Sequence, residues 1–246
     1  MKLVWAYHDG FQTGPTNSAL PADFIRHLFI QSILSSPSSY EKVIYTQEKY
    51  VDVFNQYVDR VEIFRDLEYV FLNDAKWYAV EKEENAIIID GDLFLTEELI
   101  IPSDMSLGFE VTFEFTSNIA FYSNIFLKHG IKEYIPYWQV GLPSINTGLM
   151  YINDSVIKKD LLLEYNKVRE FFKNNIEKES RLKNKTKQPS ITGSQYFLSQ
   201  YLIHNKVNYF NFSALNKFQH YFGEKKLPLL AQYIKSKTIY NKRSLL

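Results

Sequence analysis

The first ninety residues alternate between short apolar runs and longer stretches in which apolar and polar residues are mixed. The short runs predict strands, and the mixed stretches predict amphipathic helices. Strands that alternate with such helices are typical of βαβ units, and therefore of a mainly parallel sheet flanked by helices. The predicted strands cover residues 2–7, 42–46, 60–64 and 86–90, and the predicted helices cover residues 21–36, 47–57 and 73–83.

The second half of the chain is less regular. Residues 108–115 alternate apolar and polar side chains, which predicts a strand with one solvent-facing side, and 144–153 predict a strand and a turn. We expect the charged segment 177–190 to form a loop, and 193–203 to form a helix. Another helix is predicted over 154–176, where large apolar residues recur at steps of four, three, four and four on one helical face: Leu161, Tyr165, Val168, Phe172 and Ile176.

Charge and cysteine content narrow the function classes. Lys plus Arg and Asp plus Glu each number 28, and this balance argues against a generic nucleic-acid binder, which needs a basic surface. The chain has no cysteine, so any metal must be held by oxygen or imidazole ligands. No apolar run approaches the roughly 20 residues of a membrane span. We therefore expect a cytoplasmic protein without a transmembrane segment, and a peripheral membrane contact stays open.

The stretch "IIIDGDLFL" places two carboxylates, Asp90 and Asp92, directly after an apolar strand. Two ionised carboxylates this close repel each other unless a positive charge lies between them. Ligands of parallel α/β sheets bind beyond the carboxyl ends of the strands, which is where these residues fall. A D-x-D at this place suits a divalent cation whose shell is completed by a diphosphate. Two solvated turn carboxylates are the alternative.

The flanks of this motif point to a family. The segment "AKWYAVEKEENAIIIDGDLFL" (75–95) resembles glycosyltransferases of the GT-A fold, especially the glycogenin and bacterial lipopolysaccharide galactosyltransferase group. Three further stretches are similar to motifs of that group and follow in the same order: "INTGLMYIN" (145–153), "GSQYFLSQYL" (193–202) and "HYFGEKKLP" (220–228). The resemblance therefore spans residues 75 to 228.

The resemblance implies a single GT-A domain over 1–246, with a Rossmann-like nucleotide-binding half over 1–95 and an irregular acceptor-side half over 96–246. It implies a hexosyltransferase that uses Mn²⁺ or Mg²⁺. The donor would be a nucleoside-diphosphate sugar, with uridine as the expected base. The acceptor would be a hydroxyl on a glycan, a lipid-linked molecule or another compound, and retention at the anomeric carbon is expected. A small bacterial enzyme that decorates a surface polysaccharide or lipid fits this description.

The same motifs imply roles for individual residues. The metal ligands would be Asp90, Asp92 and His220, a mixed oxygen and nitrogen set that suits Mn²⁺ or Mg²⁺. Besides Asp90, the residues expected to bind the nucleotide sugar are Lys76, Gly91, Gly148, Gly223 and Lys226. The residues expected at the reacting centre are Asp92, Asn146 and Gln195. Tyr7, at the end of the first strand, is a candidate to stack on the base, and Asn146 could instead cap the turn before Gly148.

Two alternatives stay open: one follows from a departure from the family pattern, and the other from a second class of enzyme that places D-x-D after a buried strand. Ser194 stands where the family has the Asp of "GDQ", so a GT-A-like domain that binds a nucleotide or glycan without turnover is one alternative. Leu227 and Leu229 stand where the family has Pro and Trp. The other alternative is a phosphatase of the haloacid dehalogenase type with Asp90 as nucleophile. That class wants Thr or Val where this chain has Phe94.

Overall fold

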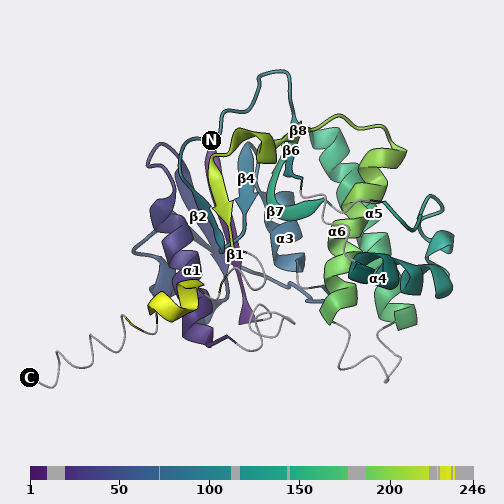
Figure 1. The fold of residues 1–246 in the computed structure, drawn as a ribbon, viewed down its shortest axis with the longest axis horizontal. Coiled ribbons are helices and arrows are strands. Elements are labelled where there is room, and N and C mark those ends of the chain that lie inside the picture. The colour runs from purple at the N-terminus through teal and green to yellow at the C-terminus, as the bar shows by residue number, and fades with distance from the viewer. Residues whose placement is uncertain are drawn as a thin grey trace, which may run out of the picture.

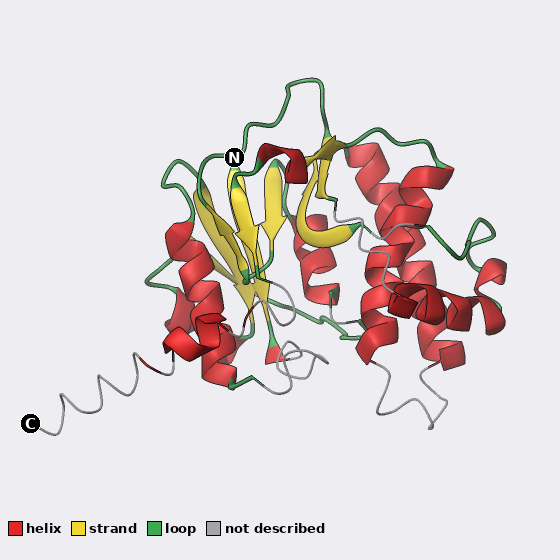
Figure 2. Cartoon of the chain, viewed as in Figure 1, coloured by secondary structure: helices red, strands yellow, loops and turns green. Residues whose placement is uncertain are grey.

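A β-sheet with helices packed on both faces lies at the centre of the molecule (Figure 1, Figure 2). It is seen in a computed structural model. The structure describes residues 1–9, 20–71, 73–111, 117–142, 145–176, 187–221, 226, 228–233 and 235, and only the backbone of 117–122 and 187–194.

The elements follow each other in the order that the sequence predicts for its first half. The strands are β1 (Lys2–Tyr7), β2 (Glu41–Thr46), β3 (Arg60–Ile63), β4 (Ala86–Ile89), β5 (Leu93–Leu95), β6 (Leu107–Glu110), β7 (Asn146–Ile152), β8 (Phe210–Asn211) and β9 (Phe218–His220). The helices are α1 (Ala22–Ser35), α2 (Val51–Phe54), α3 (Asp74–Lys82), α4 (Ser117–Lys128), α5 (Ser155–Phe171) and α6 (Lys187–His204).

Within the described residues, seven strands form the main sheet in the order β3-β2-β1-β4-β7-β6-β8. β1 is parallel to β2 and β4, β2 is parallel to β3, and β6 is parallel to β8, whereas β7 is antiparallel to β4 and β6. The expectation of a mainly parallel sheet flanked by helices is confirmed. A second sheet pairs β5 with β9 antiparallel, and in its register Leu93 faces His220.

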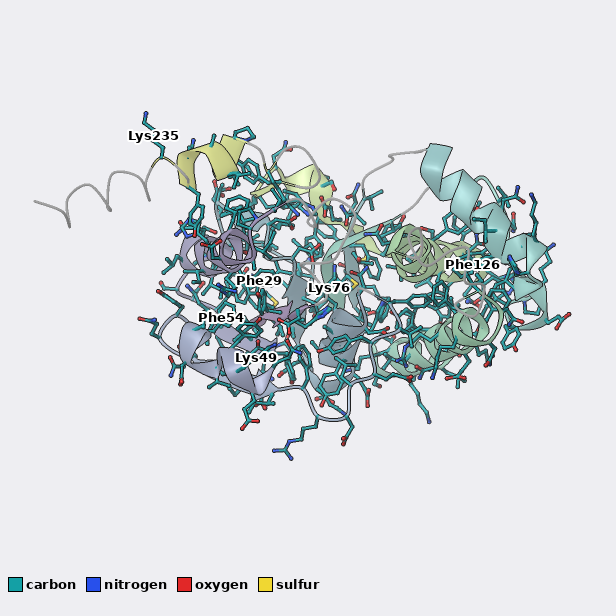
Figure 3. All side chains as sticks on the ribbon, turned by 90° about the horizontal axis from the view of Figure 1, so that it is seen from below. Phe29, Lys49, Phe54, Lys76, Phe126 and Lys235 are labelled. Carbon is teal, nitrogen blue, oxygen red and sulfur yellow. The ribbon has the colours of Figure 1, made fainter. Side chains whose placement is uncertain are left out.

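Alternate residues of the central strands fill two separate cores, because successive side chains of a strand point to opposite faces. Val4 and Ile88 pack on the face covered by α3, α4, α5 and α6, whereas Trp5 and Ile87 pack on the face covered by α1. Figure 3 shows this division, with Phe29 on the α1 side, Phe126 among the helices of the other side, and Lys76 between them. The sheet therefore carries a buried layer on each side.

The predicted helix over 154–176 is largely confirmed. Asp154 caps α5, since its Oδ1 accepts hydrogen bonds of 2.9 Å from the backbone N–H groups of Val156 and Ile157. The last turn, Phe172–Ile176, is π-helical. All members of the predicted apolar face are buried: Leu161, Tyr165, Val168, Phe172 and Ile176.

Three predicted segments differ from the structure. The strand predicted over 108–115 ends at Glu110, and 112–115 lie outside the described residues. The helix predicted over 47–57 is shorter, with one 3₁₀ turn at Glu48–Tyr50 followed by α2. The loop predicted over 177–190 is wrong for its last four residues, because α6 already begins at Lys187, and 177–186 lie outside the described residues. The signals for that loop were its charge and its single large apolar residue, and a sequence of that kind is also compatible with a helical turn.

The buried carboxylate of Glu83 connects three neighbouring strands of the sheet to helix α3. Glu83, directly after α3, binds the Lys2 ammonium at 2.7 Å, the Arg60 guanidinium at 2.7 Å and the Tyr45 hydroxyl at 2.8 Å. Burial alone raises the pKa of Glu83, but the hydrogen bonds from Lys2, Tyr45 and Arg60 outweigh it and hold that pKa below its ordinary value. The ionised form of Glu83 thus joins β1, β2 and β3 to α3.

We expect Glu83→Gln to lower the free energy of unfolding by about 3 kcal/mol at pH 7, at the low end for a broken buried ion pair, because Lys2 and Arg60 are partly exposed. Since the folded pKa of Glu83 is depressed, this stabilisation is present above the ordinary pKa of 4.5 and is lost as the pH falls through the folded pKa. Urea unfolding across this pH range measures both effects.

The exposed neighbour Glu81 provides the control, since its carboxylate pairs only with the adjacent Lys82 ammonium among the contacts that the structure describes. Glu81→Gln should change the free energy of unfolding by less than about 0.5 kcal/mol. A loss for Glu83→Gln as small as that of the control would contradict the role given to Glu83.

Candidate functional site

The turn after β4 holds the two carboxylates of the D-x-D motif at the carboxyl end of the sheet. The Asp90 N–H donates to the Gly148 carbonyl at 2.8 Å, and the Leu93 N–H donates to the Asp90 carbonyl at 3.1 Å, which closes the turn. A Cβ on Gly91 would lie 2.2 Å from the Phe29 ring. Gly91 is therefore needed so that α1 can pack against the turn backbone, a reason that the sequence did not reveal.

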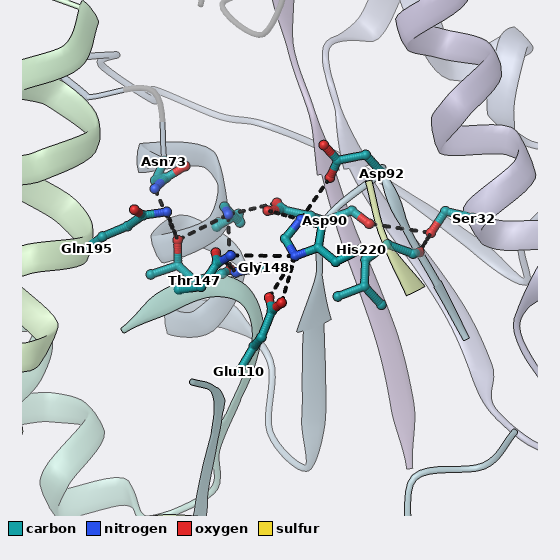
Figure 4. A network of polar contacts seen from close by, with 12 residues as sticks. Ser32, Asn73, Asp90, Asp92, Glu110, Thr147, Gly148, Gln195 and His220 are labelled. Carbon is teal, nitrogen blue, oxygen red and sulfur yellow. Dashed lines mark hydrogen bonds and ion pairs between the residues drawn. The ribbon is translucent and has the colours of Figure 1, made fainter. Parts of the chain in front are cut away.

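His220 joins these carboxylates because β9 pairs with β5, the strand that leaves the turn. The ligand atoms of Asp90, Asp92 and His220 all lie within 4.8 Å of one another (Figure 4). Nε2 of His220 is 3.3 Å from Oδ1 of Asp92 and 3.9 Å from Oδ2 of Asp90. Two carboxylate oxygens and one imidazole nitrogen are a donor set that fits Mn²⁺ or Mg²⁺. The structure thus brings together the three residues that the sequence proposes as metal ligands.

Two lysines also contact these carboxylates. The Lys76 ammonium lies 2.7 Å from Oδ1 of Asp90, and the Lys226 ammonium lies 2.7 Å from Oδ2 of Asp92. Both lysines are buried. A buried carboxylate is stable only when a positive charge or hydrogen bonds compensate it, and these two ammonium groups supply the charge.

The electrostatics of the site follow from this packing. Burial raises the pKa of Asp92, but Lys226 and His220 outweigh it and hold that pKa below its usual range. Burial lowers the pKa of His220, but hydrogen bonds to Asp92 and Glu110 outweigh it and raise that pKa to about 10. The site is therefore a set of alternating charges in which each ion is stabilised by its neighbours.

A buried hydroxyl links the metal-site carboxylates to α6. Thr147 Oγ1 lies 3.3 Å from Lys76 Nζ, 3.2 Å from Asn73 Nδ2 and 3.4 Å from Gln195 Nε2 (Figure 4). Lys76 also donates to the Thr147 carbonyl at 3.0 Å. With its bond to Asp90, the Lys76 ammonium therefore has three acceptors inside the protein. Sequence analysis missed Thr147 and Asn73, although Thr147 lies between two residues that it singled out.

The residues on either side of Thr147, Asn146 and Gly148, determine the shape of the site. Oδ1 of Asn146 accepts a 2.9 Å hydrogen bond from the Gly148 N–H, so Asn146 caps the turn, as one of the two alternatives predicted. A Cβ on Gly148 would lie 2.4 Å from Cε1 of His220 and 2.6 Å from Oε2 of Glu110. Gly148 therefore leaves room for the imidazole and its carboxylate partner.

Glu110 is a functional candidate that sequence analysis missed. It is buried at the end of β6, and its Oε2 lies 2.8 Å from Nδ1 of His220. The alternating pattern of 108–115 placed this glutamate on a solvent-facing side, which is wrong for Glu110. A charged residue within the apolar "LGFEV" was the available signal.

The remaining predicted residues have different outcomes. Tyr7 is wrong as a base-stacking residue in this structure, because its ring is fully buried and packs edge-on against Phe29 and Tyr50. Gly223 lies outside the described residues, and of Ser194 only the backbone is described. Among the described residues, no helix combines the length and the apolar character needed to cross a membrane.

Comparison with known proteins gives similarities of structure only. No protein-family model and no curated protein matches this chain. The chain is similar to the glycosyltransferase GlyE of Streptococcus pneumoniae TIGR4, with 12% identity, a TM-score of 0.47, and coverage of 85% of this chain and 45% of that chain. This chain thus spans less than half of the GlyE chain.

Two further solved structures are similar at lower scores. An active-site mutant of LgtC has 12% identity and a TM-score of 0.38, with coverage of 79% of this chain and 70% of that chain. The CTP:phosphocholine cytidylyltransferase LicC of Streptococcus pneumoniae has 10% identity and a TM-score of 0.33, with coverage of 76% of this chain and 85% of that chain. Chemistry and substrate are therefore inferred from the site itself.

We expect Gly148→Ala to lower the free energy of unfolding by about 1–3 kcal/mol, because the new methyl group overlaps His220 and Glu110. Displacement of the imidazole should also weaken Mn²⁺ binding by about ten-fold or more. Urea unfolding and a Mn²⁺ titration of the folded protein measure the two effects separately.

Gly108→Ala is the matched control, since its Cβ would lie 2.5 Å from the Phe212 ring, away from the metal-site residues. That variant should lose stability but keep its affinity for Mn²⁺. Equal Mn²⁺ affinities in the wild type and in Gly148→Ala would show that the glycine has no part in shaping the site.

Proposed function

We propose that this chain is a metal-dependent glycosyltransferase that transfers a sugar from a nucleoside-diphosphate sugar to an acceptor hydroxyl. The observation that carries the proposal is the group formed by Asp90, Asp92 and His220, with ligand atoms within 4.8 Å of one another. The group lies beyond the carboxyl end of β4, where ligands of parallel α/β sheets bind. A carboxylate pair with an imidazole suits a hard divalent cation, and such a cation is a common partner of a diphosphate.

Each charged residue has a distinct part in this proposal. A divalent cation held by Asp90, Asp92 and His220 would neutralise the negative charge of the leaving diphosphate. Lys226, which contacts Asp92, supplies a second positive charge beside that diphosphate. Lys76 has Asp90 and two oxygen atoms of Thr147 as acceptors, so its part is to hold Asp90 in place.

The acceptor side of the proposal rests on α6. Gln195 lies close to Thr147, and its side chain has an amide that can donate to and accept from sugar hydroxyls. We assign Gln195 and Asn146 to the side of the site where the sugar is transferred. Uridine as the base, Mn²⁺ as the metal and retention at the anomeric carbon come from the sequence resemblance, and the glycan or lipid-linked nature of the acceptor is proposed on the same ground.

Calorimetry of UDP binding tests the proposal. We expect the wild type to bind UDP with Mn²⁺ present and to lose that binding when the metal is removed by a chelator. Asp92→Ala should weaken metal-dependent UDP binding by more than about 100-fold, because it removes a direct ligand, whereas the loss of an indirect support costs about 10–100-fold. Asp104→Ala, which removes an exposed carboxylate elsewhere, is the control and should bind UDP as the wild type does.

Other outcomes decide between the alternatives. UDP binding that is equally strong without metal would contradict the proposal that Asp90, Asp92 and His220 bind a metal needed for UDP. Failure to bind any of UDP, GDP, CDP and dTDP would contradict the proposal of a glycosyltransferase. If UDP binds but no UDP-sugar is hydrolysed or transferred, a non-catalytic binding protein is favoured. A phosphoryl group found covalently on Asp90 would instead indicate the phosphatase.

A further inference from the structure

We infer that Glu110 is a positioning residue of the metal site, which acts by fixing the orientation and the tautomer of His220. This inference rests on the proposed function, because it requires that Asp90, Asp92 and His220 bind a divalent metal. It concerns a residue of a different strand, β6, which contacts the imidazole from the side opposite to the other two carboxylates.

The geometry of the imidazole carries the inference. Both carboxylate oxygens of Glu110 lie close to Nδ1 of His220, at 2.9 and 2.8 Å (Figure 4). The other ring nitrogen, Nε2, lies 3.3 Å from Asp92 and 3.9 Å from Asp90. A carboxylate that accepts a hydrogen bond from Nδ1–H keeps the proton on that nitrogen. When a divalent cation is held at the site, the imidazole would give up its Nε2 proton, and the lone pair on Nε2 would face the cation beside the two aspartates.

The burial of Glu110 argues that its contact with His220 is not incidental. Glu110 is 2% exposed and lies between Phe109 and Val111, which are also buried. A buried carboxylate destabilises a fold unless its oxygens are hydrogen-bonded or paired with a charge. The hydrogen bonds described for the Glu110 carboxylate all go to His220. The cost of burying this charge is therefore offset at the imidazole.

The backbone is also shaped around this pair. The pairing of β6 with β7 shifts register between Phe109 and Glu110, so that Phe109 faces Met150 while Glu110 faces Asn146. Such irregularities turn a side chain away from its regular direction and are frequent beside functional sites. On the neighbouring strand, Gly148 has no side chain where a Cβ would lie 2.6 Å from Oε2 of Glu110. Features of β6, β7 and β9 thus converge on one hydrogen bond.

A double-mutant cycle on Mn²⁺ affinity tests the inference. Free Mn²⁺ is measured by electron paramagnetic resonance with the wild type, Glu110→Gln, His220→Ala and the double variant. Gln has the size of Glu, so the fold should be kept, and circular dichroism checks this for each variant. We expect Glu110→Gln to weaken Mn²⁺ binding by about 10–100-fold. In the His220→Ala background, the same change should cause less than about a two-fold further loss, because Glu110 then has no imidazole to orient.

Two results would overturn the inference. One is a Mn²⁺ affinity of Glu110→Gln within about two-fold of the wild type. The other is an equal loss in both backgrounds, which would mean that Glu110 acts through its charge alone. Glu83→Gln removes another buried carboxylate, outside the metal site, and should leave the Mn²⁺ affinity of the folded protein unchanged.

The failure of this inference can be distinguished from failure of the proposed function. If the wild type binds Mn²⁺ and UDP together but Glu110→Gln does so equally well, only the role inferred for Glu110 is contradicted. If the wild type binds no Mn²⁺, with or without UDP, the proposed metal site falls and the role of Glu110 falls with it.

Discussion

The charge of two neighbouring carboxylates at the end of the central strand is the constraint on which the rest of the site depends. Asp90 and Asp92 follow an entirely buried strand, so their charges need compensation. The chain supplies it from Lys76 on α3, the helix before β4, from His220 on β9, and from Lys226. The contacts of His220 and Lys226 join parts of the chain that are far apart in sequence. The contacts that compensate the charges of the site therefore also hold distant parts of the chain together.

A second layer of residues keeps these ions in place. Thr147 accepts from Lys76 and also reaches Gln195, which connects the carboxylates to α6. Glu110 contacts the imidazole of His220, and Gly148 leaves the space for both. Because these residues act on the orientation of others, a change in one of them can alter the site without removing any residue that would touch a substrate.

The sequence predicts the elements well where local pattern decides them. The strands up to β4 and the helices α1 and α3 follow from apolar runs and helical spacing, and so does the buried face of α5, with Asp154 at its start. The helix predicted over 47–57 is the exception, since it is shorter than the pattern indicates. The early start of α6 at Lys187 was missed because the segment before it is charged, and charge alone does not separate an exposed helix from a loop.

Some residues of the candidate site could likewise be predicted from the sequence, and others could not. The grouping of Asp90, Asp92 and His220 agrees with the metal ligands that the sequence resemblance implies. Glu110 and Thr147 were missed because their importance comes from contacts with residues far away in sequence, and no local pattern identifies those partners. Tyr7 was misjudged for the same reason, since only the packing of α1 and α2 shows that its ring is enclosed.

The proposed function depends on a divalent cation held by Asp90, Asp92 and His220. Crystals grown with Mn²⁺ and UDP and measured at the manganese absorption edge test for this cation. We expect one anomalous peak within about 2.5 Å of both aspartates and of Nε2 of His220, beside the UDP diphosphate. A peak elsewhere, or none, would mean that these three residues do not form the metal site.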